Sequence, residues 1–328
     1  MKKLLAVTLA LAMILSASSA LAITVGFSQV GAESDWRVAN TNNVIASLKA
    51  AGYEVVYDDA QQKQENQAKA LRNFITQGVD YIVFTAVVTT GWDEVLQEVI
   101  DAEIPLILID RFPETELGDD YYTTFMGSDF PEEGRRAGQW IVEYMKSVGR
   151  DKEDINIVEL EGTTGSDAAT GRYEGIRSYL KDYPNFKIVA SQTGNFTRAE
   201  GQPVMESFLK SQSDIDVLWA HNDDMALGAI DAIKAAGKKP GEDIIIVSAD
   251  AVKAAFDAIV AGELNCSIEC SPLLGAQVVE VIQKLEKGEK PDKRTVTIEY
   301  AYDTNGGIPY AEGLTTIKAA DVITERQY

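Results

Sequence analysis

The chain has 328 residues, of which 45% are hydrophobic and 25% are charged, and its formal net charge is −21 at pH 7. A protein this acidic does not attract nucleic acid or anionic lipid through a general electrostatic field, so both are excluded as expected partners. At roughly 100–200 residues per domain, the length predicts two domains, each able to bury a core of its own.

The first 22 residues have the pattern of an export signal. Lys2 and Lys3 form a short positive segment, residues 4–15 are an apolar run, and residues 20–22 read Ala-Leu-Ala, which is typical of a cleavage site. The apolar run is shorter than the about 20 residues that cross a bilayer. We therefore predict a soluble, periplasmic protein without direct membrane insertion. The alternative is an uncleaved N-terminal helix.

After this signal, strand-like and helix-like segments alternate. Strands are predicted at 23–28, 53–58, 81–85 and 106–110, and helices at 36–51, 61–77 and 92–102. Strands of nearly continuous apolar residues, separated by helices, are typical of a parallel sheet covered on both faces. The first part of the chain is therefore predicted to form one doubly wound lobe.

The same alternation returns in the second part. Helices are predicted at 131–146, 171–181, 199–211, 225–236 and 251–261, and strands at 155–159, 188–192, 217–221 and 244–248. A long helix at 273–287 and a strand at 296–300 follow. This order predicts a second doubly wound lobe. No low-complexity linker separates the lobes, so we expect short crossings between them rather than a flexible tether.

Polar residues gather where the predicted strands end, which is where ligands bind in doubly wound sheets. These residues are Ser28-Gln29, Asp110-Arg111, Glu161-Gly162, His221-Asn222-Asp223 and Asp250. Carboxylates accept hydrogen bonds, whereas guanidinium and amide groups donate them in a fixed plane. A set of this composition suits the recognition of hydroxyl groups.

Several stretches resemble the periplasmic pentose- and hexose-binding proteins of ABC importers, and most closely the branch that binds galactofuranose. They are TVGFSQVGAESDWR (24–37), QQKQENQAKALRNFITQGVD (61–80), EIPLILIDR (103–111), GNFTRAEGQPVMESFLK (194–210) and AHNDDMALGAIDAIKAAG (220–237). The resemblance implies an α/β, type I periplasmic binding protein, in which two doubly wound parallel-sheet lobes are joined by three crossings. We expect these crossings near 126–129, 269–272 and 300–303.

The resemblance also implies domain limits and site residues. The signal peptide would be 1–22, one lobe 23–126 plus 271–299, and the other lobe 127–270 plus 300–328. The ligand-binding residues would be Glu33, Ser34, Asp35, Trp36, Arg37, Asp110, Arg111, Arg172, Asn222, Asp250 and Glu269. Trp36 would offer its ring face to the C–H groups of a sugar.

The function that the resemblance implies is that of a venus-flytrap receptor. It would be a monomer that captures a monosaccharide, with galactofuranose as the lead candidate, and delivers it to the permease subunits of an ABC importer. It would need no metal or organic cofactor and would not be an enzyme. A sugar receptor for chemotaxis or for a sensor kinase is the alternative with the same fold.

Two other classes fit the sequence less well. A transcription regulator of this fold carries an N-terminal helix-turn-helix domain, whereas this chain begins with a signal pattern. A carbohydrate-active enzyme needs two carboxylates across one bond. Asp110 and Asp250 could imitate that pair, but they lie among arginine and asparagine residues suited to stable binding.

Some residues also have a structural interpretation. Trp36 could be a packed helix residue, although we favour the ligand platform. Asp167 could touch the ligand, but we favour a helix cap. Asp223 and Asp224 are interpreted as a cap and a first-turn acid of the helix that follows. His221, the only histidine, is interpreted as structural.

The two cysteines, Cys266 and Cys270, are predicted to be free and buried. Four residues of a strand span roughly 13 Å, whereas a disulfide needs Cα atoms within about 7 Å. The only histidine has no companion at metal-ligand spacing, so no metal site is predicted.

Overall fold

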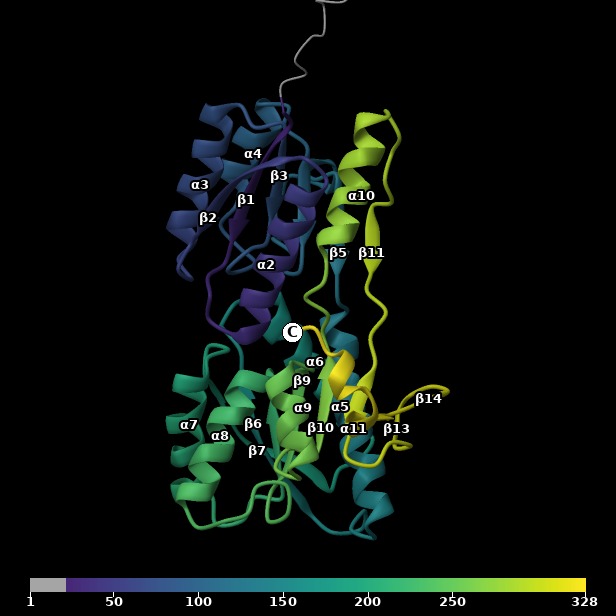
Figure 1. The fold of residues 1–328 in the computed structure, drawn as a ribbon. Helices are drawn as coiled ribbons and strands as arrows, with labels where there is room; N and C mark the ends of the chain where they lie inside the picture. The colour runs from purple at the N-terminus through teal and green to yellow at the C-terminus, as the bar shows by residue number, and fades with distance from the viewer. Residues whose placement is uncertain (1–21) are drawn as a thin grey trace, which may run out of the picture.

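Two large sheets organise the computed structural model, which describes residues 22–328. Each sheet forms its own lobe, and the lobes are stacked end to end (Figure 1). The predicted signal peptide lies outside the described residues except for Ala22. Within the described part of the chain, no helix is both long and apolar enough to cross a membrane.

The first lobe contains a six-stranded, all-parallel sheet with the order β11-β5-β4-β3-β1-β2. Its strands are β1 (Thr24–Gln29), β2 (Glu54–Asp59), β3 (Tyr81–Phe84), β4 (Leu106–Ile109), β5 (Thr124–Gly127) and β11 (Arg294–Val296). Its helices are α2 (Asp35–Ala50), α3 (Gln64–Gln77), α4 (Asp93–Asp101) and α10 (Gly275–Glu286), with a 3-10 turn η1 (Asp119–Tyr121).

The strands of this lobe are buried on both faces, as their unbroken apolar character predicts. In β4, Leu106 and Leu108 pack into the cluster formed with α3 and α4. Ile107 and Ile109 belong to the cluster on the other face, with residues of α2 and α10. Successive side chains of a strand point to opposite faces, so one short strand supplies both cores.

The second lobe contains a seven-stranded sheet with the order β15-β12-β10-β9-β8-β6-β7, parallel except where β12 meets β10. Its strands are β6 (Ile155–Glu161), β7 (Phe186–Thr193), β8 (Val217–Ala220), β9 (Ile245–Asp250), β10 (Cys266–Glu269), β12 (Ala301–Asp303) and β15 (Ile317–Lys318). Its helices are α5 (Phe130–Ser147), α6 (Asp167–Leu180), α7 (Arg198–Ser211), α8 (Asp223–Ala235), α9 (Lys253–Val260) and α11 (Ala319–Val322), followed by the 3-10 turn η2 (Ile323–Glu325). A hairpin of β13 (Pro309–Ala311) and β14 (Leu314–Thr315) projects from this lobe (Figure 1).

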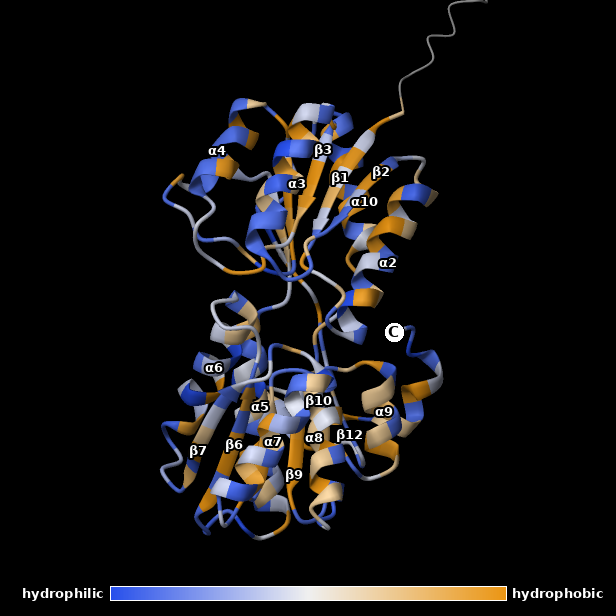
Figure 2. Ribbon diagram, turned by 90° about the vertical axis from the view of Figure 1, so that its left-hand side faces the viewer, coloured by the Kyte–Doolittle hydropathy of each residue, from blue (hydrophilic) through white to orange (hydrophobic). Residues whose placement is uncertain are grey.

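Apolar residues follow the same plan in both lobes. The central strands, such as β3 and β9, are strongly hydrophobic, whereas the surrounding helices alternate hydrophilic and hydrophobic segments (Figure 2). Both cysteines are buried and free, as predicted. The two-lobed α/β fold predicted from the alternation is therefore confirmed.

The chain passes between the lobes three times, after β5, after β10 and after β11. The third connection lies at 297–300, earlier than the predicted 300–303, because Ala301–Asp303 already pairs with β10. The strand predicted at 296–300 is likewise wrong, since β11 ends at Val296. The lobe limits given above lie next to these connections and stay predictions.

Candidate functional site

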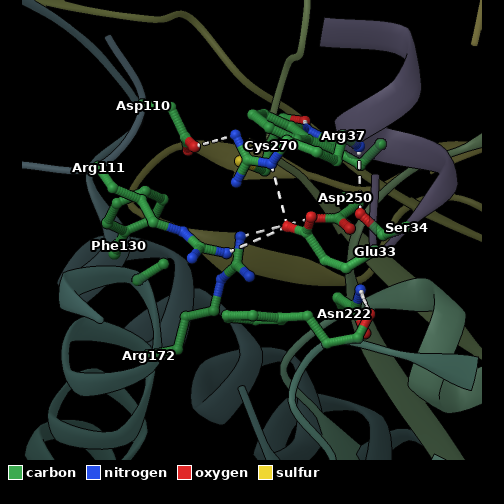
Figure 3. A pocket seen from close by; sticks show the side chains of 13 residues that line it. Glu33, Ser34, Arg37, Asp110, Arg111, Phe130, Arg172, Asn222, Asp250 and Cys270 are labelled. Carbon is green, nitrogen blue, oxygen red and sulfur yellow. Dashed lines mark hydrogen bonds and ion pairs between the residues drawn. The ribbon is translucent and has the colours of Figure 1, made fainter. Parts of the chain in front are cut away.

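Side chains from both lobes line one pocket (Figure 3). The first lobe contributes Glu33, Ser34, Trp36, Arg37, Asp110 and Arg111, and the second lobe with its connection contributes Phe130, Ala168, Arg172, Phe196, Asn222, Asp250 and Cys270. The cavity that these residues enclose is only about 20 Å³, roughly the room that one water molecule needs. The side chains of the two lobes therefore nearly fill the pocket in this arrangement, and a larger ligand needs them to move apart.

The loop after β1 and the start of α2 supply one wall. Ser34 is the N-cap of α2, and its side-chain oxygen accepts a hydrogen bond from the backbone N–H of Arg37 at 3.1 Å. This cap fixes the first turn of the helix, which carries Trp36 and Arg37 into the pocket. The indole N–H of Trp36 donates to the carbonyl of Cys270 at 2.6 Å, so its ring is also anchored to the second connection.

Two acidic residues at the ends of strands have an unusual backbone conformation. Asp110, directly after β4, has a φ of 59°, and Asp250, the last residue of β9, has a φ of 117°. Positive φ costs free energy for a residue other than glycine, and such residues cluster at functional sites. At Asp110 the left-handed turn ends the strand alternation, so that both Asp110 and its neighbour Arg111 face the pocket.

Arg37 is the centre of the charge network in the first lobe. Its guanidinium contacts Asp110 Oδ2 at 2.5 Å, Glu33 Oε1 at 3.0 Å and the side-chain oxygen of Gln29 at 3.1 Å. Burial lowers the pKa of Arg37, but Asp110 and Glu33 outweigh it, and the pKa stands above its ordinary value. Burial, together with the charge of Arg37, lowers the pKa of Arg111, whose own acid partner, Glu33, is 3.6 Å away.

Arg172 is the centre of the charge network in the second lobe. Its Nε donates to Glu133 Oε2 at 2.7 Å, and its Nη2 lies 3.5 Å from Asp250 Oδ1. Burial raises the pKa of Asp250 well above its ordinary value, although Arg172 opposes this shift. A further nitrogen of Arg172 donates to the backbone carbonyl of His221. His221 itself does not line the pocket, because its ring lies against Glu159 at 3.1 Å.

Aromatic rings fill the space between these charges. The guanidinium of Arg37 lies 4.7 Å from the ring centre of Trp36, and that of Arg111 lies 4.9 Å from Phe196. Phe196 fits against the chain because Gly162 has no side chain there, since a Cβ at Gly162 would come within 1.9 Å of its ring. The pocket thus combines three acids, three arginines, one amide and apolar ring faces.

Two predicted residues do not line this pocket. Asp35 stands in the first turn of α2, where its backbone N–H donates to Asp224 Oδ2 at 2.9 Å. Glu269 at the end of β10 binds Arg326 at 2.7 Å and the hydroxyl of Tyr328 at 3.0 Å, so it holds the C-terminal segment. The side chain that reaches the pocket from this connection is the next one, Cys270.

Four lining residues were absent from the predicted set, namely Phe130, Ala168, Phe196 and Cys270. Phe130 follows the first connection, and Phe196 has a φ of 63° in the tight loop between β7 and α7. The rule that strand ends form the site could have pointed to both loops. Their apolar side chains, however, carry no signal of hydroxyl recognition in the sequence.

Three hydrogen bonds join the lobes beside the pocket, and we call them the rim contacts. Asp167 Oδ2 accepts from the N–H of Phe112 at 2.7 Å, Asp224 Oδ2 accepts from Asp35 as above, and the N–H of Thr89 donates to the carbonyl of Gly165 at 2.8 Å. Burial raises the pKa of Asp167 to about 7 and that of Asp224 to about 7.

These contacts correct two predicted caps. The N-cap of α6 is Ser166, and Asp167 stands in the first turn, where it reaches across to the other lobe. The N-cap of α8 is Asn222, whose side chain accepts from Met225 N, and Asp223 and Asp224 both follow it in the first turn. Thr197 is the N-cap of α7, and its hydroxyl oxygen accepts a hydrogen bond from the backbone N–H of Glu200.

Comparison with known proteins places this chain in a defined family. The model of the periplasmic binding protein domain matches residues 25–290. The galactofuranose-binding protein YtfQ of Escherichia coli (strain K12) is 43% identical over 305 residues, which cover 92% of this chain and 94% of that protein. The ribose import binding protein RbsB of the same organism is 30% identical over 240 residues, covering 73% and 76%.

Three solved structures are also similar to this chain over most of its length. A protein of Mycobacterium smegmatis in complex with β-D-fucofuranose is 51% identical with a TM-score of 0.83, covering 86% of this chain and 91% of that one. The periplasmic binding protein component of the arabinose ABC transporter from Shewanella sp. ANA-3, bound to α- and β-L-arabinofuranose, is 44% identical with a TM-score of 0.83, covering 93% and 95%. A galactofuranose-binding protein is 40% identical with a TM-score of 0.85, covering 93% and 98%.

Proposed function

This chain belongs to the periplasmic binding protein family, and from that membership we propose that it captures a neutral monosaccharide between its lobes and delivers it to an ABC importer. Galactofuranose is the lead candidate, because the relative with 43% identity is named a galactofuranose-binding protein. The fucofuranose and arabinofuranose held by two similar structures support a five-membered sugar ring more generally.

The observation that carries this proposal is the balance of charge in the pocket. Glu33, Asp110 and Asp250 face Arg37, Arg111 and Arg172, so acids and bases are equal in number. Such a set offers both donors and acceptors to hydroxyl groups, which a neutral ligand with many hydroxyl groups needs. The ring faces of Trp36, Phe130 and Phe196 suit the C–H groups of a sugar.

Capture would couple to closure of the lobes. A ligand that contacts both walls of the pocket stabilises the closed state by its differential affinity for that state. The three connections are the expected hinge. The permease subunits of the importer would then recognise the closed form. We further infer a periplasmic monomer that performs no chemistry on its ligand.

The test is a binding screen followed by identification of the bound ring form. Isothermal titration calorimetry would compare galactose, arabinose, ribose and galacturonate. The ligand released from the protein would be examined by NMR at once, before its ring forms re-equilibrate. We expect neutral sugars to bind and the released fraction to be enriched in furanose. Failure of every neutral monosaccharide to bind, tighter binding of galacturonate, or conversion of the sugar to product would contradict the proposal.

A further inference from the structure

A single carboxyl group joins all three connections between the lobes. Glu299 lies in the third connection, and its Oε1 accepts hydrogen bonds from the backbone N–H of Ser271 at 2.9 Å and from the hydroxyl of Thr297 at 2.6 Å. It also accepts a short hydrogen bond from the hydroxyl of Ser128. Ser128 belongs to the first connection, Ser271 to the second and Thr297 to the third. One oxygen atom is therefore the common point of the hinge.

This junction is connected to the pocket by two short routes. Ser128 Oγ lies 3.2 Å from the thiol of Cys270, which lines the pocket. The carboxyl of Glu133 lies in the same cluster, and its Oε2 accepts from Arg172, which also lines the pocket. Ligand atoms of Glu133, Cys270 and Glu299 all lie within 4.8 Å of one another. Arg172 and Cys270 are thus each connected to the hinge cluster through one intervening side chain, Glu133 and Ser128 respectively.

The charges around the cluster favour a proton over a metal ion. Arg172 contacts Glu133 at 2.7 Å, Arg136 donates to the backbone carbonyl of Glu299 at 3.3 Å, and Arg294 donates to the carbonyl of Ser128 at 2.7 Å. These guanidinium groups would repel a cation. Burial first, and then the neighbouring Glu133, raise the pKa of Glu299 to about 8. A protonated carboxyl keeps an acceptor oxygen for its three donors without adding a second buried negative charge.

We propose that Glu299 is a positioning residue that holds the three connections at one point and thereby sets the balance between the open and closed arrangements of the lobes. The inference rests on the proposed function, because sugar capture gives that balance its purpose. It nevertheless makes a separate claim about the hinge, which can be measured without any sugar.

The test compares three variants. Glu299→Ala removes the common acceptor, and Glu299→Gln keeps an acceptor oxygen in nearly the same place. Asp303→Ala is the matched control, because Asp303 is another buried carboxyl with backbone and hydroxyl donors, here Gly306 and Thr316, but all of its partners lie within the second lobe. Fluorescent labels on exposed sites, one on each lobe, would report the interlobe distance with and without galactose.

We expect Glu299→Ala to broaden the interlobe distance distribution without sugar and to weaken sugar binding at least about tenfold, which corresponds to about 1.4 kcal/mol. Glu299→Gln should restore both properties to within about threefold. Asp303→Ala should lower the melting temperature without changing either property. Interlobe distances in Glu299→Ala equal to those of the wild type would overturn the proposal. If the wild type binds no sugar, the distance measurement still tests the hinge, and the failure belongs to the proposed function alone.

Discussion

At the scale of single residues, the pocket depends on buried charges that satisfy one another. Asp110 is the clearest case, because its Oδ2 accepts from both Arg37 and the hydroxyl of Thr85. Removing one member leaves its partner buried without compensation, which costs more than the loss of a contact on the surface. Affinity should therefore respond far more to these residues than to surface ion pairs.

We expect Asp110→Ala and Arg111→Ala each to weaken sugar binding by about 2–4 kcal/mol, since each leaves a buried charged group unmatched in the pocket. Calorimetric titration with the best sugar of the screen would measure the loss. Arg72→Ala is the control, because Arg72 forms its ion pairs with Glu94 and Glu98 on the exposed surface of the first lobe. Affinities of both pocket variants equal to that of the control would remove these residues from the site.

Much of the pocket was predictable from the sequence, because polar residues after parallel strands converge at one edge of a sheet. Asp110, Asn222 and Asp250 lie there for this reason. Phe130 and Phe196 were not predicted, because the pocket walls that they form exist only once the two lobes meet. From the sequence alone, Phe130 and Phe196 cannot be distinguished from residues of an ordinary hydrophobic core.

At the scale of elements, α2 links folding to the site. Its N-cap, Ser34, lines the pocket and fixes the turn that carries Trp36 and Arg37. A cap stabilises its helix by about 1 kcal/mol, so this one side chain contributes both to stability and to the position of two groups that line the pocket. Stability and affinity should fall together when it is removed.

Ser34→Ala should lower the free energy of unfolding by about 1 kcal/mol and also weaken sugar binding, because the first turn of α2 loses its fixed position. Urea denaturation and calorimetry measure the two effects. Gly78→Ala is the control, since Gly78 has a φ of 65° at the C-cap of α3, far from the pocket. That variant should lose a similar free energy of unfolding and keep its affinity. A Ser34→Ala variant with lowered stability and full affinity would contradict this role.

The third connection shows where pattern reasoning failed at this scale. Residues 296–300 alternate apolar and polar side chains, which predicts a half-buried strand. In the structure Val296 is 51% and Ile298 is 82% exposed, because the segment crosses between the lobes at their surface. The alternation of apolar and polar residues indicates an extended backbone. It does not distinguish a strand within a sheet from an extended connection between two sheets.

At the scale of the whole molecule, closure of the lobes buries carboxyl groups. The pKa of Asp167 and that of Asp224 are each raised from 3.8 to about 7, mainly by burial at the rim contacts. We expect both side chains to return to water, and their pKa to return to its ordinary value, when the lobes separate. The closed form should then hold more protons than the open form between about pH 4 and pH 7.

The sign of the resulting pH dependence follows from this difference. Closure, and with it sugar affinity, should strengthen as the pH falls through 7, and this gain should be lost as the pH rises above 7. Each of the two carboxyl groups should raise the sugar affinity by up to about tenfold as the pH falls from 8 to 6. Calorimetry across this range would measure the slope, and Asp167→Asn combined with Asp224→Asn should flatten it. An equally steep slope in the double variant would assign the pH dependence to other groups.

The order of the strands along the chain also determines when each lobe can finish folding. The first lobe needs α10 and β11, at 275–296, and these residues leave the ribosome only after nearly all of the second lobe. Until then the face of its sheet that packs against Val278 and Ile282 is covered only by α2. The second lobe in turn waits for β12 and β15. A chain with this arrangement can complete neither sheet until almost all of it has been synthesised.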